Sequence, residues 1–445
     1  MKLGLIALSG VRVCNQELLA LGLTLPGFVE RSKVIASLPS LGLLTLGGMT
    51  PADVSVEYLE VPDLEHADDL SLGFDAVAIS SYTAQIRDAY SVADRYRSQG
   101  IKVILGGPHV TAMPYEARSH ADSVVLGEGE LAWKAVLHDL TMGDLQAVYD
   151  VRGGNHDLAD APMPRFDLLD IERYNRLTVQ TQRGCPYNCD FCASSRRISA
   201  QFKVKPVEKV IAEIRNIKSL WNRPFIEFAD DNTFANKAHG KRLLRALIPE
   251  KIRWFTETDI SIAEDDELLQ LLRDSGCAQV LIGLESPRSS FLDGIEKKSN
   301  WKSRQVDNYL SAIDKIQGSG VTVNGCFIMG LDGADPDSFQ EVIEFVKQSA
   351  LYEVQVTIQT AFPGTPLYER LKASGRLLND TAWDTCTLFD VNFLPQNMTV
   401  QELEQNFRVL MKELYNEEFT AWRRRMFRQR LKEARREGKP PSHES

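Results

Sequence analysis

Short apolar runs alternate with helical patterns through the first part of the chain, where Leu41–Gly48 and Ile86–Ser98 are the clearest helices. We predict strands at Lys2–Leu8, Val54–Glu60, Ala76–Ser80, Lys102–Leu105 and Ser123–Leu126. Repeated strand–helix–strand order is typical of a parallel sheet with helices on both faces. Residues 1–145 are therefore predicted to form one doubly wound α/β domain.

A second strand–helix series follows residues 146–170, a stretch rich in Gly, Pro and Asp that we interpret as a linker. Strands are predicted at Thr178–Gln182, Phe225–Phe228, Arg253–Glu257, Gln279–Ile282, Val321–Ile328 and Glu353–Gln359, with helices such as Val207–Leu220 between them. This order predicts a partial (β/α)6 barrel over residues 171–370, with its chemistry at the carboxyl ends of the strands. Residues 371–445 are predicted to be a helical extension that includes a basic tail.

The length and charge of the chain narrow the possible classes. Its 445 residues are too many for one ordinary core, so two domains and an appendage are expected. The formal net charge of −10 argues against a nucleic-acid partner, because such proteins usually carry a basic face. We find no secretory signal and no uncharged apolar run of the roughly 18 residues that a membrane span needs. These features predict a soluble cytoplasmic protein.

Three of the seven cysteines lie close together, in the motif Cys185-Pro-Tyr-Asn-Cys189-Asp-Phe-Cys192. Clustered thiols in a cytosolic protein indicate a metal or redox site rather than a disulfide framework. One loop with three thiolates can hold a four-iron cluster and leave one iron open for a ligand. A zinc knuckle is the alternative, but it normally needs a fourth Cys or His, and none occurs between Ala193 and Ala238.

Polar or glycine-rich residues end several predicted barrel strands. Asp230, Asp231 and Asn232 follow one strand, and the two carboxylates suit an ammonium partner, although Asp and Asn also cap helices well. Glu285 follows another strand and could accept hydrogen bonds from hydroxyl groups, while the neighbouring Ser286 could instead be a cap. Gly325, in the fifth strand, permits close backbone approach.

Three strands of the first domain end in Gly, Ser or Thr. The motifs are Ser80-Ser81-Tyr82-Thr83, Gly106-Gly107-Pro108-His109 and Gly127-Glu128-Gly129-Glu130. Because the carboxyl ends of parallel strands meet at one edge of a sheet, we predict a ligand crevice there. Glycines let a bulky cofactor approach the backbone, and none of the three motifs is a Walker loop or a dinucleotide fingerprint.

The segment from Arg183 to Cys192 resembles the radical S-adenosylmethionine (SAM) signature, and the resemblance covers roughly residues 170–370. Pro39-Ser-Leu-Gly-Leu-Leu, Gly-Gly-Pro-His and Gly-Glu-Gly-Glu are similar to the cobalamin-binding domain that precedes many such barrels. The resemblance implies a 4Fe–4S cluster on Cys185, Cys189 and Cys192. It implies SAM contacts from Phe191, Asp230, Asp231, Glu285, Ser286, Gly325, Phe327, Met329 and Gly330. It implies cobalamin contacts from Ser80, Ser81, Thr83, Gly106, Gly107, His109, Gly127, Glu128 and Gly129. The chain lacks Asp-x-His-x-x-Gly, so no protein histidine is expected on cobalt.

By this resemblance the chain is similar to class B radical SAM methyltransferases. A reduced cluster would cleave SAM to a 5′-deoxyadenosyl radical, the radical would take hydrogen from an unactivated carbon, and methylcobalamin would methylate that carbon. A second interpretation keeps the radical step but gives ring formation, rearrangement or oxidation, with a vestigial cobalamin domain. A third is a non-catalytic iron–sulfur or cobalamin sensor, which would make no 5′-deoxyadenosine. An RNA-modifying enzyme would need an RNA-binding module, and the sequence after the barrel shows none.

The expected partners are a small-molecule or lipid substrate and an electron donor such as flavodoxin or ferredoxin. From Trp422 to Arg436 basic residues interleave with apolar ones. A basic amphipathic helix can lie on an anionic membrane. A solvated terminal helix is the interpretation that we favour.

Overall fold

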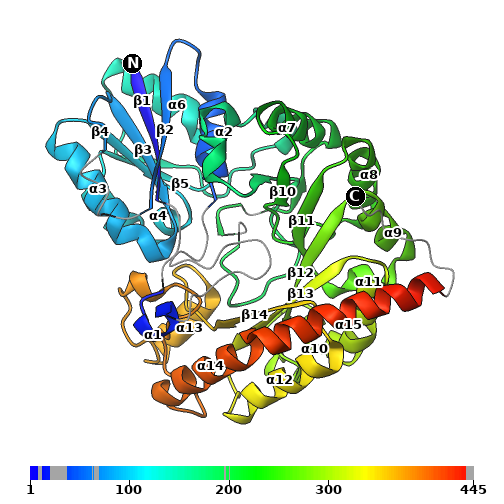
Figure 1. The fold of residues 1–445 in the computed structure, drawn as a ribbon. Coiled ribbons are helices and arrows are strands. Elements are labelled where there is room, and N and C mark those ends of the chain that lie inside the picture. Colours follow the sequence, from blue (N-terminus) through cyan, green and yellow to red (C-terminus); the bar gives the residue numbers. More distant parts are fainter. Residues whose placement is uncertain are drawn as a thin grey trace.

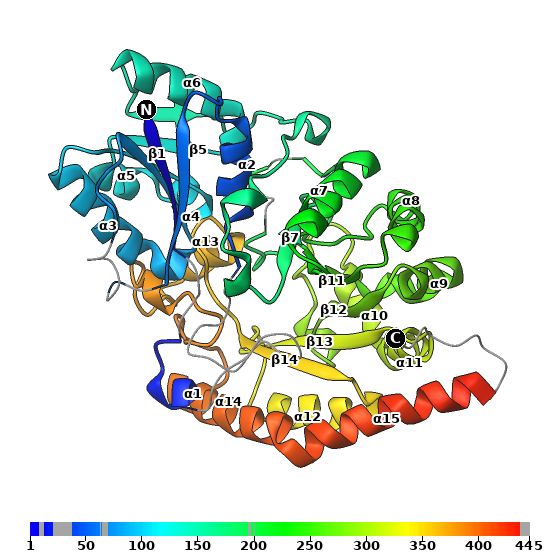
Figure 2. The ribbon, with the colours of Figure 1, turned by 45° about the horizontal axis from the view of Figure 1, so that its top comes forward.

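The computed structural model describes residues 1–8, 13–20, 38–62, 64, 70–194, 197–199 and 201–436. Two α/β units lie side by side, and a segment that follows the second unit returns beneath the first (Figure 1). The last two helices cross the outside of the second unit (Figure 2). The end of the predicted extension, residues 437–445, lies outside the described residues.

The first unit is a parallel sheet in the order β2-β1-β3-β4-β5-β6, with α2 and α6 on one face and α3 on the other (Figure 1). Strand β1 is buried along almost its whole length because helices cover both faces of the sheet. The doubly wound prediction is confirmed. The strands are β1 (Lys2–Leu8), β2 (Ser55–Val61), β3 (Ala76–Ser81), β4 (Lys102–Gly106), β5 (Ser123–Leu126) and β6 (Val148–Asp150). The helices are α2 (Leu41–Met49), α3 (Ile86–Ser98), α4 (Pro108–Ala112), α5 (Pro114–Ala117) and α6 (Gly129–Met142).

Strand β6 lies inside the stretch that the sequence indicated as a linker. It pairs in parallel with β5, so the first sheet extends beyond the predicted boundary at residue 145. As a short and largely exposed edge strand, β6 has no apolar run that would mark it in the sequence. We infer that the first domain includes residues up to 150.

The second unit is an open parallel sheet in the order β7-β10-β11-β12-β13-β14, curved into a partial barrel (Figure 2). Successive strands lie side by side in chain order, as repeated β–α–β crossovers of one hand produce. The six-stranded prediction is confirmed. The strands are β7 (Leu177–Val179), β10 (Phe225–Phe228), β11 (Arg253–Thr258), β12 (Cys277–Glu285), β13 (Thr322–Met329) and β14 (Glu353–Ile358). The helices are α7 (Val207–Leu220), α8 (Lys237–Leu247), α9 (Asp266–Asp274), α10 (Trp301–Gln305), α11 (Tyr309–Gly318) and α12 (Asp337–Ser349).

The first barrel strand is shorter than predicted. Strand β7 ends at Val179, and the chain then forms β8 (Gln182–Arg183), which pairs antiparallel with β9 (Lys203–Val204) outside the barrel sheet. The cause is Asp230, whose carboxylate accepts the backbone N–H groups of Thr181 at 2.8 Å and Gln182 at 3.0 Å. These two N–H groups are therefore unavailable to a neighbouring strand.

Alternate side chains of each barrel strand point outwards to the helices or inwards to the barrel interior. In β11, Trp254 is fully buried, and its ring lies tilted against that of Phe228 with the centroids 4.8 Å apart. Its Nε1 donates to the carbonyl of Ser275 beyond α9. Trp254 therefore faces the helices. Glu257, an odd number of positions further along, faces the barrel interior.

The segment after the barrel contains α13 (Pro366–Ala373), and its helices resume only at α14 (Val400–Tyr415) and α15 (Glu417–Arg436). The predicted extension over residues 371–445 is thus mainly loop before Val400. This loop ties the two units together, because Trp383 Nε1 donates to both carboxylate oxygens of Glu116 at 3.0 Å. Asp390 accepts the N–H groups of Cys14 and Asn15, which lie beside α1 (Gln16–Ala20).

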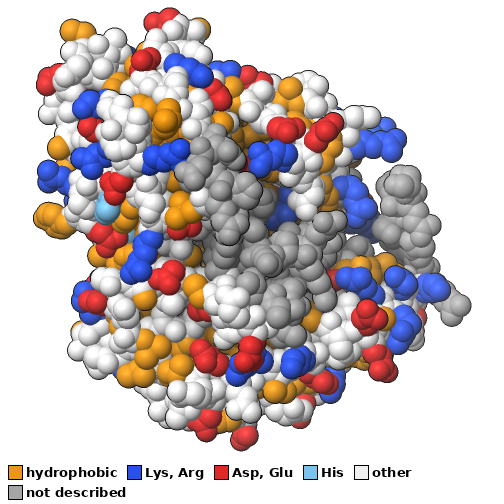
Figure 3. All heavy atoms as spheres, turned by 60° about the vertical axis from the view of Figure 1, so that its left-hand side comes forward, with side chains coloured by type: hydrophobic (Ala, Val, Ile, Leu, Met, Phe, Trp, Pro, Cys, Tyr) orange, Lys and Arg blue, Asp and Glu red, His pale blue; other side chains and the backbone are white. Residues whose placement is uncertain are grey.

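The basic helix α15 packs on its own chain. Arg423 is fully buried, Arg424 pairs with Glu353 at 2.7 Å, and Arg430 donates to the carbonyl of Ser349 at 2.9 Å. These contacts fit the terminal-helix interpretation of the tail. Figure 3 shows acidic and basic side chains interspersed over another face of the molecule.

Among the helices that the structure describes, none is both long and apolar enough to cross a membrane.

Candidate functional site

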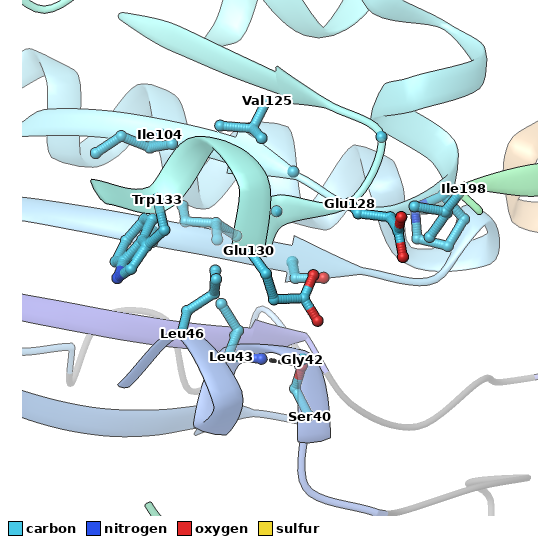
Figure 4. A pocket seen from close by; sticks show the side chains of 18 of the residues that line it. Ser40, Gly42, Leu43, Leu46, Ile104, Val125, Glu128, Glu130, Trp133 and Ile198 are labelled. Carbon is cyan, nitrogen blue, oxygen red and sulfur yellow. Dashed lines mark hydrogen bonds between the residues drawn. The ribbon is translucent and has the colours of Figure 1, made fainter. Parts of the chain in front are cut away.

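The carboxyl ends of the first sheet surround a cavity of about 300 Å³ at the boundary between the two units (Figure 4). Leu43 and Leu46 of α2 face Trp133 of α6 across it, and Ile104 and Val125 add to the apolar wall. The cavity adjoins the point between β1 and β3 where the strand order reverses, which is where parallel α/β sheets bind ligands. The remaining walls come from Gln180, Arg183 and Ile198 of the second unit.

Glycines leave the backbone of this cavity bare. Gly107 has φ +107° and Gly127 has φ +97°, conformations that side chains other than glycine rarely adopt. A Cβ on Gly107 would lie 3.0 Å from Ser80 Oγ, and a Cβ on Gly127 would lie 3.0 Å from the backbone N of Arg152. The turns therefore require glycine, and a bulky ligand can approach their main chain.

The structure brings most of the predicted cobalamin residues together. Those that line the cavity are Ser80, Gly106, Gly107, Gly127, Glu128 and Gly129. Ser81, Thr83 and His109 do not line it. The predicted contacts did not include the residues of α2 that line the cavity. The motif Pro39-Ser-Leu-Gly-Leu-Leu could have indicated them.

His109 lies outside the cavity and is only 1 % exposed. Its ring meets Trp383 edge-on at 5.1 Å, and its Nε2 lies 3.5 Å from Glu116. Burial lowers the pKa of His109 to about 4, so the imidazole is neutral at neutral pH. His109 therefore helps the loop that carries Trp383 to pack on the first unit. It does not line this cavity, and its predicted contact with cobalamin stays a prediction.

The three clustered cysteines lie on the loop that follows β8. Gly184 precedes Cys185 with φ +84°, and a Cβ there would lie 2.9 Å from the carbonyl oxygen of Gln201. Asp190 fixes the middle of the loop, because its N–H donates to Ile295 at 3.0 Å and its carboxylate pairs with Arg370 at 3.0 Å. The loop is thus held by a backbone hydrogen bond to Ile295 and an ion pair with Arg370 of α13. Phe191, in the same loop, is partly buried against the core.

The cysteine thiols are close enough to affect one another's ionisation. Burial raises the pKa of Cys185 to about 11 and of Cys189 to about 12, and the neighbouring thiols contribute to both shifts. Burial also raises the pKa of Cys192. A metal must displace these protons to bind. No three His, Cys, Asp or Glu side chains in the described part of the chain converge on one metal-ion position. In a four-iron cluster each thiolate binds a different iron, so three thiols on one loop suit it.

The carboxylate of Asp230 accepts hydrogen bonds from other residues of the chain. Besides the two N–H groups already described, it accepts the hydroxyl groups of Thr181 at 2.5 Å and Thr233 at 2.9 Å. Burial raises its pKa to about 6 despite these bonds. Asp230 therefore holds the strand that leads into the cysteine loop. Its neighbour Asp231 acts electrostatically on Cys185 and Cys192.

Glu285 ends β12 with φ +64°, a conformation that costs energy for a residue with a side chain. Its carboxylate pairs with Lys302 at 2.6 Å, and the same ammonium donates to the carbonyl of Gly283 at 3.0 Å. Burial disfavours the Lys302 ammonium, but Glu285 and Cys189 outweigh burial and raise its pKa. Lys302 was not predicted, because nothing in its local sequence links it to Glu285. Ser286 Oγ accepts the N–H of Arg288 at 3.0 Å, as the capping alternative expects.

Three of the residues predicted to contact SAM on the fifth barrel strand have their side-chain positions on its outer face. Phe327 packs on Phe345 of α12 at 5.7 Å, and a Cβ on Gly325 would meet side chains of Leu351 and Leu284. Met329 shares this outer face, and Gly330 packs against Phe393 and Leu403. Asn324, Cys326 and Ile328 face inwards instead. The side chains of Phe327 and Met329 therefore pack away from the barrel interior, and the predicted SAM contacts of Gly325, Phe327, Met329 and Gly330 stay a prediction.

A buried ionic network joins the cavity to the cysteine loop. Arg183 donates to Glu128 at 2.7 Å and to Glu130 at 2.6 Å. Lys203 donates to both oxygens of Glu128 at 2.8 Å and to the carbonyl of His156 at 2.7 Å. Figure 4 shows Glu128 and Glu130 at the cavity. Because Arg183 stands two residues before Cys185, the network couples the positions of the two sites.

Comparison with known families agrees with this geometry. Residues 179–346 match the family described as the radical SAM superfamily, and residues 32–137 match the B12 binding domain. The chain carries a B12-binding domain followed by a radical SAM domain. Residues 365–444 of this radical SAM protein match a domain of unknown function.

Curated relatives of this radical SAM protein include methyltransferases. It is 28% identical over 350 residues to bacteriochlorophyllide d C-12(1)-methyltransferase of Chlorobaculum tepidum, covering 77% of this chain and 75% of that one. It is 27% identical over 358 residues to hopanoid C-2 methylase of Rhodopseudomonas palustris, covering 78% and 67%. The methyltransferase TsrM from Kitasatospora setae, solved with cobalamin and a [4Fe-4S] cluster, has the same fold, with a TM-score of 0.65, 14% identity and coverage of 98% and 99%.

The residues of this radical SAM protein fit the cofactors of its family. The bare glycine backbone and apolar wall of the cavity suit cobalamin, and the three thiols on one anchored loop suit a 4Fe–4S cluster that binds SAM. All the cysteines are free, so no disulfide competes for these thiols.

Proposed function

We propose that this radical SAM protein methylates an unactivated carbon of a small-molecule or lipid substrate. The observation that carries the proposal is the Arg183–Glu128 contact, which joins the glycine-lined cavity to the cysteine loop across the domain boundary. A methyl donor and a radical source must both reach one substrate carbon, so their sites need a fixed separation. The curated methyltransferase relatives support the same reaction class.

The cofactors supply the difficult chemistry: when bound, the reduced cluster cleaves SAM to a 5′-deoxyadenosyl radical, and cobalamin provides the methyl group. The chain's own residues position these partners. Cys185, Cys189 and Cys192 would hold the cluster, and Asp230 holds the strand before them. Lys302 pairs with the Glu285 carboxylate, and both charges act on Cys189. Residues of both units line the cavity.

The substrate and partners are part of the same proposal. The named substrates of the two methyltransferase relatives, a bacteriochlorophyllide and a hopanoid, favour a bulky and largely apolar substrate. Two electrons per turnover would have to come from outside the chain, one for the cleavage of SAM and one to reduce cobalamin again after it has given up its methyl group. A flavodoxin or ferredoxin would supply them. Three unoxidised ligand thiols suit the reducing cytoplasm.

The test is anaerobic reconstitution with iron, sulfide, hydroxocobalamin, reductant and SAM, followed by desalting, spectroscopy and a 5′-deoxyadenosine assay. The proposal expects cluster absorption, retained cobalamin and 5′-deoxyadenosine. The matched control replaces all three cysteines by alanine. It should retain cobalamin but lose the cluster and the product, because the two sites use different residues.

Two results would overturn the proposal. Formation of 5′-deoxyadenosine by protein that retains no cobalamin would favour radical chemistry without methyl transfer. An assembled cluster that never yields 5′-deoxyadenosine, even with extracts of candidate lipids and other small molecules, would favour a sensor.

A further inference from the structure

Glu257 stands one residue before the carboxyl end of β11 and faces the barrel interior. Trp254 and Thr256 are fully buried against the outer layer, whereas the Glu257 side chain is exposed to the interior. Glu257 pairs with Leu281 of β12, and Leu281 pairs with Asn324 of β13. Paired residues of neighbouring strands share a face, so the Asn324 side chain also faces inwards.

The inward face offers acceptors that lack donors. In the described part of the chain, nothing forms a hydrogen bond or an ion pair with the Glu257 carboxylate. Asn324 is 3% exposed, and its Oδ1 accepts no hydrogen bond from any described residue. Gln355 Oε1, on the adjacent inward position of β14, is in the same situation. A ligand that fills this interior is therefore required to bring donors or positive charge.

The other carboxylates of the interior already have partners. Glu227 pairs with Arg176, Glu285 pairs with Lys302, and Asp230 has the hydrogen bonds described above. The groups that act on Glu257 are Glu227, Asp231, Asp230 and Glu285, all of them acidic. The protein atoms that surround the interior keep bulk water from solvating this carboxylate, and together with the acidic neighbours they raise the pKa of Glu257 to about 8. A titratable group kept in so unfavourable a place is typical of a functional site.

Asp231 connects Glu257 to the cysteine loop. It acts electrostatically on Glu257 and also on Cys185 and Cys192. A molecule that binds to a cluster on those cysteines therefore enters the space beside Asp231 and Glu257. SAM is such a molecule in this family, and it carries a positive sulfonium.

We propose that Glu257 binds the sulfonium of SAM and gives the barrel its preference for SAM over S-adenosylhomocysteine. The two molecules share their amino, carboxylate, ribose and adenine groups, but the sulfur of S-adenosylhomocysteine is a neutral thioether. Reductive cleavage also makes the sulfur neutral, since one electron enters and the carbon–sulfur bond breaks to give methionine and the radical. The attraction therefore acts on intact SAM only. The inference rests on the proposed function only in placing SAM in the barrel.

The experiment compares the affinities of SAM and S-adenosylhomocysteine for reconstituted wild-type and Glu257→Gln protein by equilibrium dialysis. Glutamine keeps the shape of the side chain and removes the carboxylate, and the dialysis is run above the raised pKa of about 8, where Glu257 is ionised. Loss of a charge-assisted contact should weaken SAM about tenfold or more and leave S-adenosylhomocysteine unchanged. Glu264→Gln is the matched control, because Glu264 is exposed and lies 3.8 Å from Lys237. Cluster absorption verifies that each variant is assembled.

The outcomes separate this inference from the function on which it rests. Equal weakening of both ligands would overturn the sulfonium contact and indicate a contact with their shared groups. Unchanged affinity for both would also overturn it. Wild-type protein that has its cluster but binds no SAM would refute the proposed function as well.

Discussion

Replacing Arg183 by methionine tests the network that joins the two candidate cofactor sites. The side chains of Arg183, Glu128 and Glu130 are 14%, 1% and 9% exposed, so solvent screens their attraction weakly. In the variant Glu128 keeps Lys203, but Glu130 keeps no cation within 4 Å among the described residues. Removing one partner of a buried ion pair costs about 3–5 kcal/mol. We expect a loss of stability of that order and weaker retention of cobalamin.

The pH dependence of this loss has a definite sign. Burial opposes ionisation of Glu130, but Arg183 outweighs it and lowers the pKa of Glu130 in the folded protein. A carboxyl with a lowered pKa stabilises the fold above its unfolded pKa, and this contribution disappears as the pH falls through the folded value. The difference between wild type and Arg183→Met should therefore be largest at neutral pH and shrink in acid.

The assay is denaturant unfolding of the cofactor-free protein at neutral and at acidic pH. Arg152→Met is the control, since its pair with Asp150 is half exposed and should contribute less than about 1 kcal/mol. The reasoning is refuted if Arg183→Met costs no more than Arg152→Met, or if its effect does not change with pH.

Three further changes have expected outcomes. Gly129→Leu should abolish cobalamin retention but not cluster assembly, because Gly129 lines the cavity and a Cβ there would lie 3.6 Å from Leu46. Gel filtration followed by the absorbance of bound cobalamin measures retention, and cobalamin retained by this variant would contradict the site. Cys189→Ala should remove cluster absorption and 5′-deoxyadenosine, whereas Cys277→Ala, which changes a buried cysteine outside the loop, should preserve both. Glu257→Gln should raise the melting temperature of the cofactor-free protein at neutral pH. Its carboxyl has a pKa raised from 4.5 to about 8, which costs stability increasingly as the pH rises between those values. The gain should vanish near pH 4.5, and a gain that persists there would contradict this assignment.

Much of the fold could be predicted because its strands are local apolar runs. Strands β1 and β5 and helices α3 and α7 have the predicted bounds, since both periodicity and flanking turns mark them. Strand β6 was not predicted, because an exposed edge strand of three residues has no recognisable hydrophobic pattern. Strand β7 was predicted too long, because Asp230, which is distant in sequence, accepts hydrogen bonds from the N–H groups of Thr181 and Gln182 that would have continued the strand.

The sites divide in the same way. The cysteine motif and the glycine turns are local signals, and the structure gathers each of them at one place. The contacts of Lys302 with Glu285 and of Arg183 with Glu128 join separate elements, so no local pattern reveals them. The glycine motif of β13 predicted that another group approaches the backbone closely, but not on which face of the strand. In the structure the side chains of Leu351 and Leu284 approach Gly325.

The most direct test of methyl transfer uses SAM whose methyl group carries three deuterium atoms. The anaerobically reconstituted protein would be incubated with this SAM and reductant, and its bound cobalamin would then be analysed by mass spectrometry. The account predicts that cobalamin released from the protein carries the deuterated methyl group and that Gly129→Leu protein yields none. Protein that makes 5′-deoxyadenosine while its retained cobalamin never acquires the label would contradict the account.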